Sequence, residues 1–320
     1  MTLSVERCET CGGLVDLEDL FCANCGTKVP DRHENETARL TIEAKNYQCQ
    51  GCGASMNYDA SAQTLKCPFC GSVELTEDAS QGILAPESVV PFALERVEAE
   101  NRLLAWLGSS FWHPRDLRSA AQLTELTAVY VPVWVFATRV LTNWTADTSH
   151  TPFGAHAPWF PVASRGERSY DAIWIAASSG IPQRDLSAIW PFDVSTAVPP
   201  DKVDLVDVIV EQVTVSRRYA RPRVQGILES FEVESVAREI PGKHRNIHVN
   251  VLMQDATSCA ALVPIYAMAY RYRERVYRFV INGQSGHSTG SAPVSVSKVF
   301  GIIGVFVLIA IVTLLMVARG

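Results

Sequence analysis

The sequence lacks several signature motifs of the common enzyme classes. Its 320 residues contain no G-x-x-x-x-G-K-[ST], no His-Glu-x-x-His and no G-x-G-x-x-G after a predicted strand. These strings hold, respectively, nucleotide phosphates, a catalytic zinc ion and a dinucleotide. The seven histidines are scattered along the chain. We therefore expect no enzymatic activity, and we assign no catalytic and no cofactor-binding residues.

The chain also lacks an excess of positive charge. It carries 28 lysine and arginine residues against 34 aspartate and glutamate residues, which gives a formal net charge of −6. Non-specific binding to nucleic acid rests on lysine and arginine contacts to phosphate, so this balance argues against it. The first residues show no basic start and no apolar run of the kind found in signal peptides. We therefore expect the thiols of this protein to stay reduced.

Cysteine, in contrast, is concentrated at one end of the chain. Eight of the nine cysteines form four Cys-x-x-Cys pairs within the first seventy residues, and a glycine follows each pair. Two such pairs can surround one tetrahedral metal ion, and the glycine permits the left-handed turn that points backbone N–H groups at the thiolates. The sequence therefore predicts two four-cysteine zinc ribbons, each holding one structural Zn²⁺. Their ligands are Cys8, Cys11, Cys22 and Cys25 in the first, and Cys49, Cys52, Cys67 and Cys70 in the second.

Other interpretations of the cysteine pairs are weaker. Disulfides, a redox-active dithiol and an iron–sulfur centre all use closely spaced cysteines. Four thiolates leave no open coordination position, which is typical of structural zinc.

Two further side chains could be taken for functional residues. We expect His33 to be exposed instead of ligating a metal, because both quartets are complete without it, and we expect Cys259 to be a buried structural thiol.

The C-terminal segment is strongly apolar. Residues 299–318 read VFGIIGVFVLIAIVTLLMVA, without a charge and with Thr313 as the single polar side chain. A helix of this length rises about 30 Å, the thickness of a bilayer's hydrocarbon core. A buried core helix is the alternative. The pattern predicts a single-pass transmembrane anchor over 298–320, in the inner (cytoplasmic) membrane, with the bulk of the chain in the cytoplasm, where thiolates can hold metal.

The expected fold class is α+β, with two small zinc ribbons, a mixed antiparallel α+β middle domain and one C-terminal transmembrane helix. The expected units are a first ribbon over 1–30, a linker over 31–46, a second ribbon over 47–76, a linker over 77–91, the middle domain over 92–297 and the anchor over 298–320. Within the middle domain, periodicity predicts helices over 92–107 and 221–238 and strands over 126–137 and 260–272. Pro132 suggests an edge strand or a bulge.

One internal echo occurs in the middle domain. The segment VPVWVFA at 131–137 is answered by VPIYAMA at 263–269. Both read Val-Pro, a branched residue, an aromatic residue, two apolar residues and alanine. Two matching strands in one sheet, or a duplicated β-unit, would explain this similarity; coincidence is the alternative for so short a match.

These segments resemble a bacterial family of zinc-ribbon membrane proteins, often labelled primosomal-helicase-like or TFIIB-type zinc-ribbon proteins. The resemblance runs from about Cys49 onward and rests on the strings YVPVWVFAT, IWPFDVSTAVPPDKV, IPGKHRNIHVNV and, above all, VPIYAMAYRYRERVYRFVINGQSG. The first ribbon is similar to detachable double-zinc-ribbon modules. The resemblance implies action beside phage-shock-type, ESCRT-III-like membrane-remodelling proteins. We reject the helicase label, because a helicase motor needs the phosphate-binding motif that the chain lacks.

Two functions of different classes follow. The first is a membrane-anchored, cytoplasm-facing adaptor whose zinc ribbons bind or recruit protein partners, such as a phage-shock-type ESCRT-III-like protein, in envelope stress or membrane remodelling. The alternative is a membrane-tethered nucleic-acid-binding protein that uses a ribbon for recognition. The acidic balance of the chain favours the adaptor. The sequence leaves the oligomeric state open.

Overall fold

The structure is a computed structural model of the whole chain. It describes residues 6–12, 14–15, 21–22, 25–29, 45–58, 66–77, 86–123, 126–150, 158–205 and 208–319. His33 and most of the expected linker over 31–46 lie outside the described residues, as does the middle of the expected linker over 77–91.

The described part of the chain contains short strands at its start and long strands later. The strands are β1 (Glu6–Arg7), β2 (Leu14–Val15), β3 (Lys45–Cys49), β4 (Ser55–Tyr58), β5 (Leu75–Glu77), β6 (Ser88–Val89), β7 (Gln122–Leu123), β8 (Thr127–Thr148), β9 (Phe160–Ala176), β10 (Ile209–Glu211), β11 (His244–Tyr272), β12 (Arg275–Asn282) and β13 (Ser288–Gly290). The helices are α1 (Arg96–Ser109), α2 (Leu117–Ala120), α3 (Gln183–Ala188), α4 (Arg217–Glu239) and α5 (Val296–Arg319), with two 3₁₀ turns, Val194–Thr196 and Pro200–Lys202.

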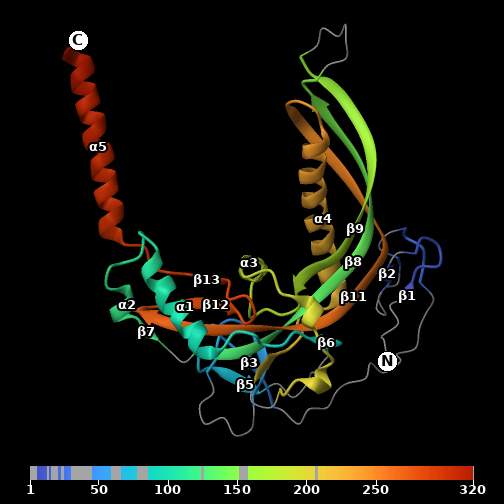
Figure 1. Cartoon of the computed structure of the whole chain (residues 1–320), viewed down its shortest axis with the longest axis horizontal. Coiled ribbons are helices and arrows are strands. Elements are labelled where there is room, and N and C mark those ends of the chain that lie inside the picture. Colours follow the sequence, from blue (N-terminus) through green and yellow to red (C-terminus); the bar gives the residue numbers. More distant parts are fainter. Residues whose placement is uncertain are drawn as a thin grey trace.

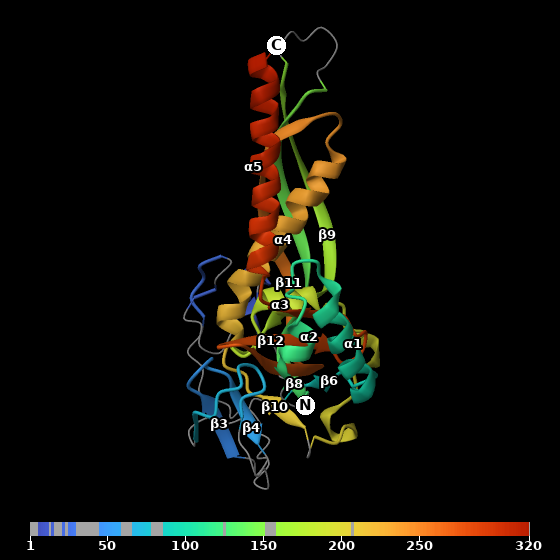
Figure 2. The same ribbon diagram turned by 90° about the vertical axis from the view of Figure 1, so that its left-hand side faces the viewer.

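One large mixed sheet organises the molecule. Eleven strands form it, in the order β13-β12-β11-β8-β10-β4-β3-β5, while β9 pairs with β8, and β6 and β7 pair with β11. Figure 1 shows that β8, β9 and β11 curve upward from the base of this sheet as a long arm, with α4 on the inner side of the arm. On the other side of the base, α5 rises beside α2. Figure 2 shows α5 and the arm edge-on, both extending away from the base.

The two echo segments lie on neighbouring strands, as one explanation of the similarity requires. β8 and β11 are antiparallel neighbours, and their register places Val131 opposite Val263. The two Val-Pro pairs therefore occupy equivalent positions on adjacent strands of one sheet.

The prolines of these pairs lie inside central strands, not on an edge strand. Ala177 donates to the carbonyl of Pro132 at 3.0 Å, and Gly283 donates to that of Pro264 at 2.9 Å. The N–H and C=O of one strand residue point to the same side of the strand. The N–H that each proline lacks would therefore point to the side on which its carbonyl accepts this hydrogen bond. On this side of β8, the paired strand changes from β10 to β9 at Pro132. On the corresponding side of β11, the paired strand changes from β6 to β12 at Pro264. Each proline thus occupies a break in the ladder, which needs no donor.

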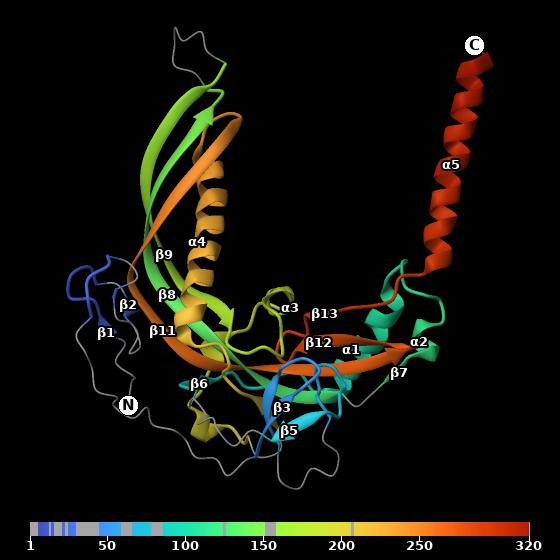
Figure 3. The same cartoon turned by 180° about the vertical axis from the view of Figure 1, so that it is seen from behind.

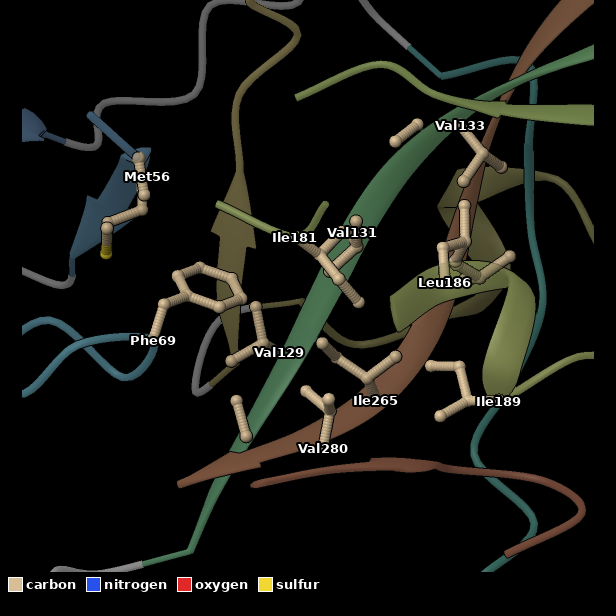
Figure 4. Packing of buried hydrophobic residues seen from close by; sticks show 14 of the residues in the cluster. Met56, Phe69, Val129, Val131, Val133, Ile181, Leu186, Ile189, Ile265 and Val280 are labelled. Atoms are coloured by element: carbon tan, nitrogen blue, oxygen red, sulfur yellow. The ribbon is translucent and has the colours of Figure 1, made fainter. Parts of the chain in front are cut away.

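Alternation along β8 and β11 divides the core between the two faces of the sheet. Odd-numbered residues such as Val131, Val263 and Ile265 join a cluster with α3 and the second cysteine-rich unit. Even-numbered residues of β11, such as Met268, pack with α1, and those of β8, such as Phe136, pack with α4. Figure 4 shows odd-numbered side chains such as Val131 and Ile265 in one cluster with Met56 and Phe69 of the cysteine-rich unit. The core is therefore continuous across units far apart in sequence.

A buried polar cluster fixes α4 to the arm. Glu232 on α4 is fully buried and accepts hydrogen bonds from two β9 residues: Arg168 Nη1 donates to its Oε2 at 2.5 Å, and the Tyr170 hydroxyl donates to its Oε1 at 2.6 Å. Arg168 also pairs with Glu239. Both carboxylate oxygens of Glu232 are therefore satisfied, which a buried charge requires.

The C-terminal transmembrane helix expected over 298–320 is a wrong prediction. Among the residues that the structure describes, no helix is long and apolar enough to cross a membrane. Helix α5 covers this stretch but begins with Ser297 and Lys298 in its first turn. The fold class is therefore corrected to a large mixed sheet with a few helices.

The Glu232 cluster yields a stability prediction with a control on the same helix. We expect Glu232→Ala to lower the free energy of unfolding by about 3 kcal/mol, because it leaves Arg168 and Tyr170 without their buried partner. The control is Glu234→Ala, whose side chain is 69% exposed and pairs with Arg238; it should cost under about 0.5 kcal/mol. Urea unfolding followed by circular dichroism measures both, and equal effects would contradict the proposed role of the cluster.

Candidate metal centres

The four Cys-x-x-Cys pairs form four copies of the same backbone turn. The glycine after each pair has a positive φ, +68° at Gly12, +73° at Gly26, +76° at Gly53 and +72° at Gly71. In every copy the glycine N–H donates to the carbonyl of the first cysteine at 2.8 Å. A residue with a Cβ is strained at such φ values. The left-handed turn predicted from the Cys-Gly pattern is therefore confirmed.

The first tetrad brings together cysteines from two of these turns. The sulfur atoms of Cys8 and Cys25 are 3.5 Å apart, and those of Cys11 and Cys22 are 3.6 Å apart. All four sulfurs lie within 4.8 Å of one another. A disulfide needs sulfurs about 2.05 Å apart, so these separations exclude disulfides within the tetrad. The tetrad can hold one metal ion.

The second tetrad has the same geometry. Cys49 and Cys70 bring their sulfurs to 3.5 Å, and Cys52 and Cys67 bring theirs to 3.6 Å. These four sulfurs also lie within 4.8 Å of one another. The eight residues predicted from spacing therefore gather into two separate groups, each able to hold an ion.

The donor set fits zinc. Four thiolates at about 2.3 Å from a tetrahedral ion stand roughly 3.8 Å apart, close to the observed separations. The pKa values of the cysteines in the second tetrad also favour a bound cation. Hydrogen bonding from Cys67 lowers the pKa of Cys52 to about 5, whereas burial raises the pKa of Cys70 to about 11. Four clustered thiols cannot all ionise unless a cation offsets their charge, and a metal ion displaces the remaining protons.

The two tetrads differ in how they are attached to the molecule. The first belongs to a two-stranded sheet of its own, β1 with β2, and to a small core of Cys8, Val15, Cys22 and Val29. The second lies within the main sheet, because β4 pairs with β10, which in turn pairs with β8. Its Cys49 and Cys67 belong to the large core cluster. Figure 3 shows β3 and β5 beneath the base of the sheet, and β1 and β2 on the outer side of the arm.

Hydrogen bonds also fix the second tetrad to the loop before α3. The Ser179 hydroxyl donates to the carbonyl of Gly53, the glycine that follows Cys52, at 2.8 Å. A Cβ added to Gly180 would overlap the Glu211 carboxylate and the Phe69 ring. The backbone of this loop therefore approaches the second ribbon as closely as only glycine permits.

Glu211 is a buried acid that sequence reasoning missed. It lies on β10, 2% exposed, and its Oε1 accepts a hydrogen bond from the Gly180 N–H at 2.7 Å. Its Oε2 has no hydrogen-bond partner among the described residues. Burial raises the pKa of this carboxyl to about 8. The available signal was an acid directly after the apolar run VIV at 208–210.

Cys259 is the one cysteine outside the tetrads. It lies on β11 opposite Val135 and is half-buried, and burial raises the pKa of its thiol. A raised pKa disfavours the reactive thiolate.

Comparison with known proteins gives one relative of unknown role. The chain is 26% identical over 313 residues to the uncharacterized protein YdjG of Bacillus subtilis (strain 168), covering 79% of this chain and 92% of that protein. No protein-family model and no solved structure matches the chain.

The different attachment of the tetrads predicts different consequences of losing each metal. Cys22→Ser and Cys67→Ser should each lower the metal content from two ions per chain to one. We expect Cys67→Ser to lower the main thermal transition by roughly 10 °C or more, because this site is part of the large core. Cys22→Ser should leave that transition within about 2 °C. Elemental analysis and calorimetry measure the two effects, and equal shifts would refute the distinction.

The buried carboxyl of Glu211 predicts that the stability of the fold depends on pH. Its folded pKa of about 8 exceeds the unfolded value of about 4.3, so the protonated side chain stabilises the fold at low pH, and this contribution is lost as pH rises through 8. Gln imitates the protonated form. The melting temperature of Glu211→Gln, minus that of the unsubstituted protein, should therefore increase from pH 6 to pH 9 in metal-loaded samples. Glu74→Gln, on the exposed surface of the same ribbon, should give a constant difference. A pH-independent difference for Glu211→Gln would disprove this.

Proposed function

We propose that the protein is a zinc-ribbon adaptor, with no catalytic role, that recruits protein partners. In this proposal both tetrads hold a structural Zn²⁺, and the first ribbon is the binding head. The observation that carries the proposal is the small first ribbon, which has its own two-stranded sheet and places an exposed aromatic side chain beside a metal ligand.

That side chain is Phe21. It precedes Cys22 directly and is 58% exposed, and its backbone bridges to Lys28 across the ribbon. The tetrad fixes the backbone on which Phe21 is carried, so the ring is presented at little cost in conformational entropy. Exposed, preorganised aromatic residues are typical anchors of protein interfaces. Closed four-thiolate sites support a structural role for the metal over a catalytic one.

The second ribbon has a different part in this proposal. Because it shares strands and core with the main sheet, it serves as a support for the fold. The net charge of −6 supports protein partners over nucleic acid. The thiolates require a reducing compartment, so we place the ribbons in the cytoplasm. A phage-shock-type, ESCRT-III-like protein is the candidate partner that the sequence resemblance implies.

Site-specific crosslinking in cells tests the proposal. A photoreactive phenylalanine analogue at position 21 should crosslink to a defined protein, whereas the same analogue at Val97 on α1, which is 66% exposed, should not. Adding Cys8→Ser should abolish the product, because the ribbon that positions residue 21 no longer holds its metal. The purified ESCRT-III-like protein should then bind the purified full chain, with roughly tenfold weaker affinity for Phe21→Ser.

Two results would overturn the proposal. One is the same crosslinked products from positions 21 and 97. The other is specific DNA or RNA binding that strengthens as salt falls and disappears in Cys49→Ser, which would favour the nucleic-acid alternative.

A further inference from the structure

A cavity with cationic walls lies at the end of the base sheet where α5 begins. Its volume is about 960 Å³, and three separate segments line it: the residues just before α2, the turn between β11 and β12, and the lead-in to α5. Figure 1 shows these elements together at one end of the base, beside α2 and β7. Cavities of this size hold small-molecule ligands or large headgroups.

The charges lining the cavity are mostly positive. Arg115, Arg273, Arg275 and Lys298 line it together with two acids, Asp116 and Glu274. Asp116 is already engaged, because the Tyr272 hydroxyl donates to its Oδ1 at 2.9 Å and Arg273 lies 3.7 Å from its Oδ2. The other three cations therefore face a single remaining acid.

None of these three cations is neutralised by an ion pair within the described part of the chain. Arg115 and Arg275 have no acidic partner there. Lys298 donates from Nζ to the carbonyls of Phe111 and His113, each at 2.8 Å. These carbonyls hold the ammonium in place but leave its charge uncompensated.

Two backbone features reinforce the attraction for anions. Helix α5 begins at Val296, and the residues on both sides of this start, Ser295 and Ser297, line the cavity. The positive end of the helix dipole therefore faces the cavity. At the opposite rim, Arg273 has a φ of +54°. Glycine or asparagine ordinarily occupies such a turn position, so an arginine there is retained at a cost in backbone strain.

We propose that this cavity binds a phosphate-bearing anion, either a free phosphorylated compound or a phospholipid headgroup. Arginine guanidinium groups match phosphate oxygens in pairs, and several cations around one space favour a multiply charged group over a single carboxylate. The site lies apart from both tetrads and does not depend on the adaptor proposal.

Calorimetric titration of the zinc-loaded full chain with inorganic pyrophosphate tests the site. We expect Arg115→Gln/Arg275→Gln to weaken binding roughly tenfold or more, because two charged contacts are lost. The matched control is Arg118→Gln/Arg271→Gln, which removes the same charge from the same two segments outside the cavity lining; it should change affinity by about twofold or less. Circular dichroism and metal analysis after each titration establish that the variants are folded and loaded.

Vesicles distinguish the two sources of phosphate. Binding to phosphatidylglycerol vesicles that pyrophosphate displaces and Arg115→Gln/Arg275→Gln abolishes would identify a headgroup. Pyrophosphate binding without such vesicle binding would identify a free compound. The proposal fails if neither probe binds at up to millimolar concentration, or if both double variants lose affinity equally, which would indicate only a diffuse surface charge.

Discussion

Strands β8 and β11 pair antiparallel along most of their length, and nearly every other part of the molecule is attached to this pair. Their register puts Val131 opposite Val263. Along its outer side, β8 pairs first with β10 and then with β9. Along the opposite outer side, β11 pairs first with β6 and then with β12. The prolines at 132 and 264 lie at these two transitions. A one-residue slip would put each proline against a neighbour that needs its N–H, and would also exchange the two faces of the core.

The second cysteine tetrad is best understood as part of the core that this pairing creates. Met56 and Phe69, from the same unit, belong to the same core cluster as Val131 and Ile265 of the central strands. A small ribbon has too few apolar residues to fold alone without metal. Here the sheet supplies part of the missing core and the tetrad supplies the rest. The buried carboxyl of Glu211 belongs to the same junction, where its protonated form avoids the cost of an unpaired buried charge.

Sequence reasoning succeeded where the chemistry is local. Cysteine spacing and the following glycines predict the two tetrads, because each turn is determined by a few adjacent residues. The Val-Pro echo suggested matching strands in one sheet or a duplicated β-unit, with coincidence as the alternative, and the two segments lie on paired strands. The single sheet that joins the second ribbon to the middle domain depends on β10, only three residues long, which pairs with segments far away in sequence. Arg115, Arg275 and Lys298 likewise meet only through tertiary structure, so no spacing predicts their cavity. The apolar run near the C-terminus misled, because length and composition alone suggested a span.

Strand β12 connects the cationic cavity to the second metal centre through direct contacts. Its first residue, Arg275, lines the cavity. Farther along, Arg278 donates to the carbonyl of Gly180 at 2.9 Å and pairs with Asp185 of α3. Gly180 in turn donates to Glu211 beside the second ribbon. An anion that draws Arg275 inward acts on the strand whose next charged residue holds the loop against the tetrad. If binding at the cavity and metal retention at the second site affect each other, this strand is the shared element, and the first ribbon, folded on its own sheet, should be indifferent to both.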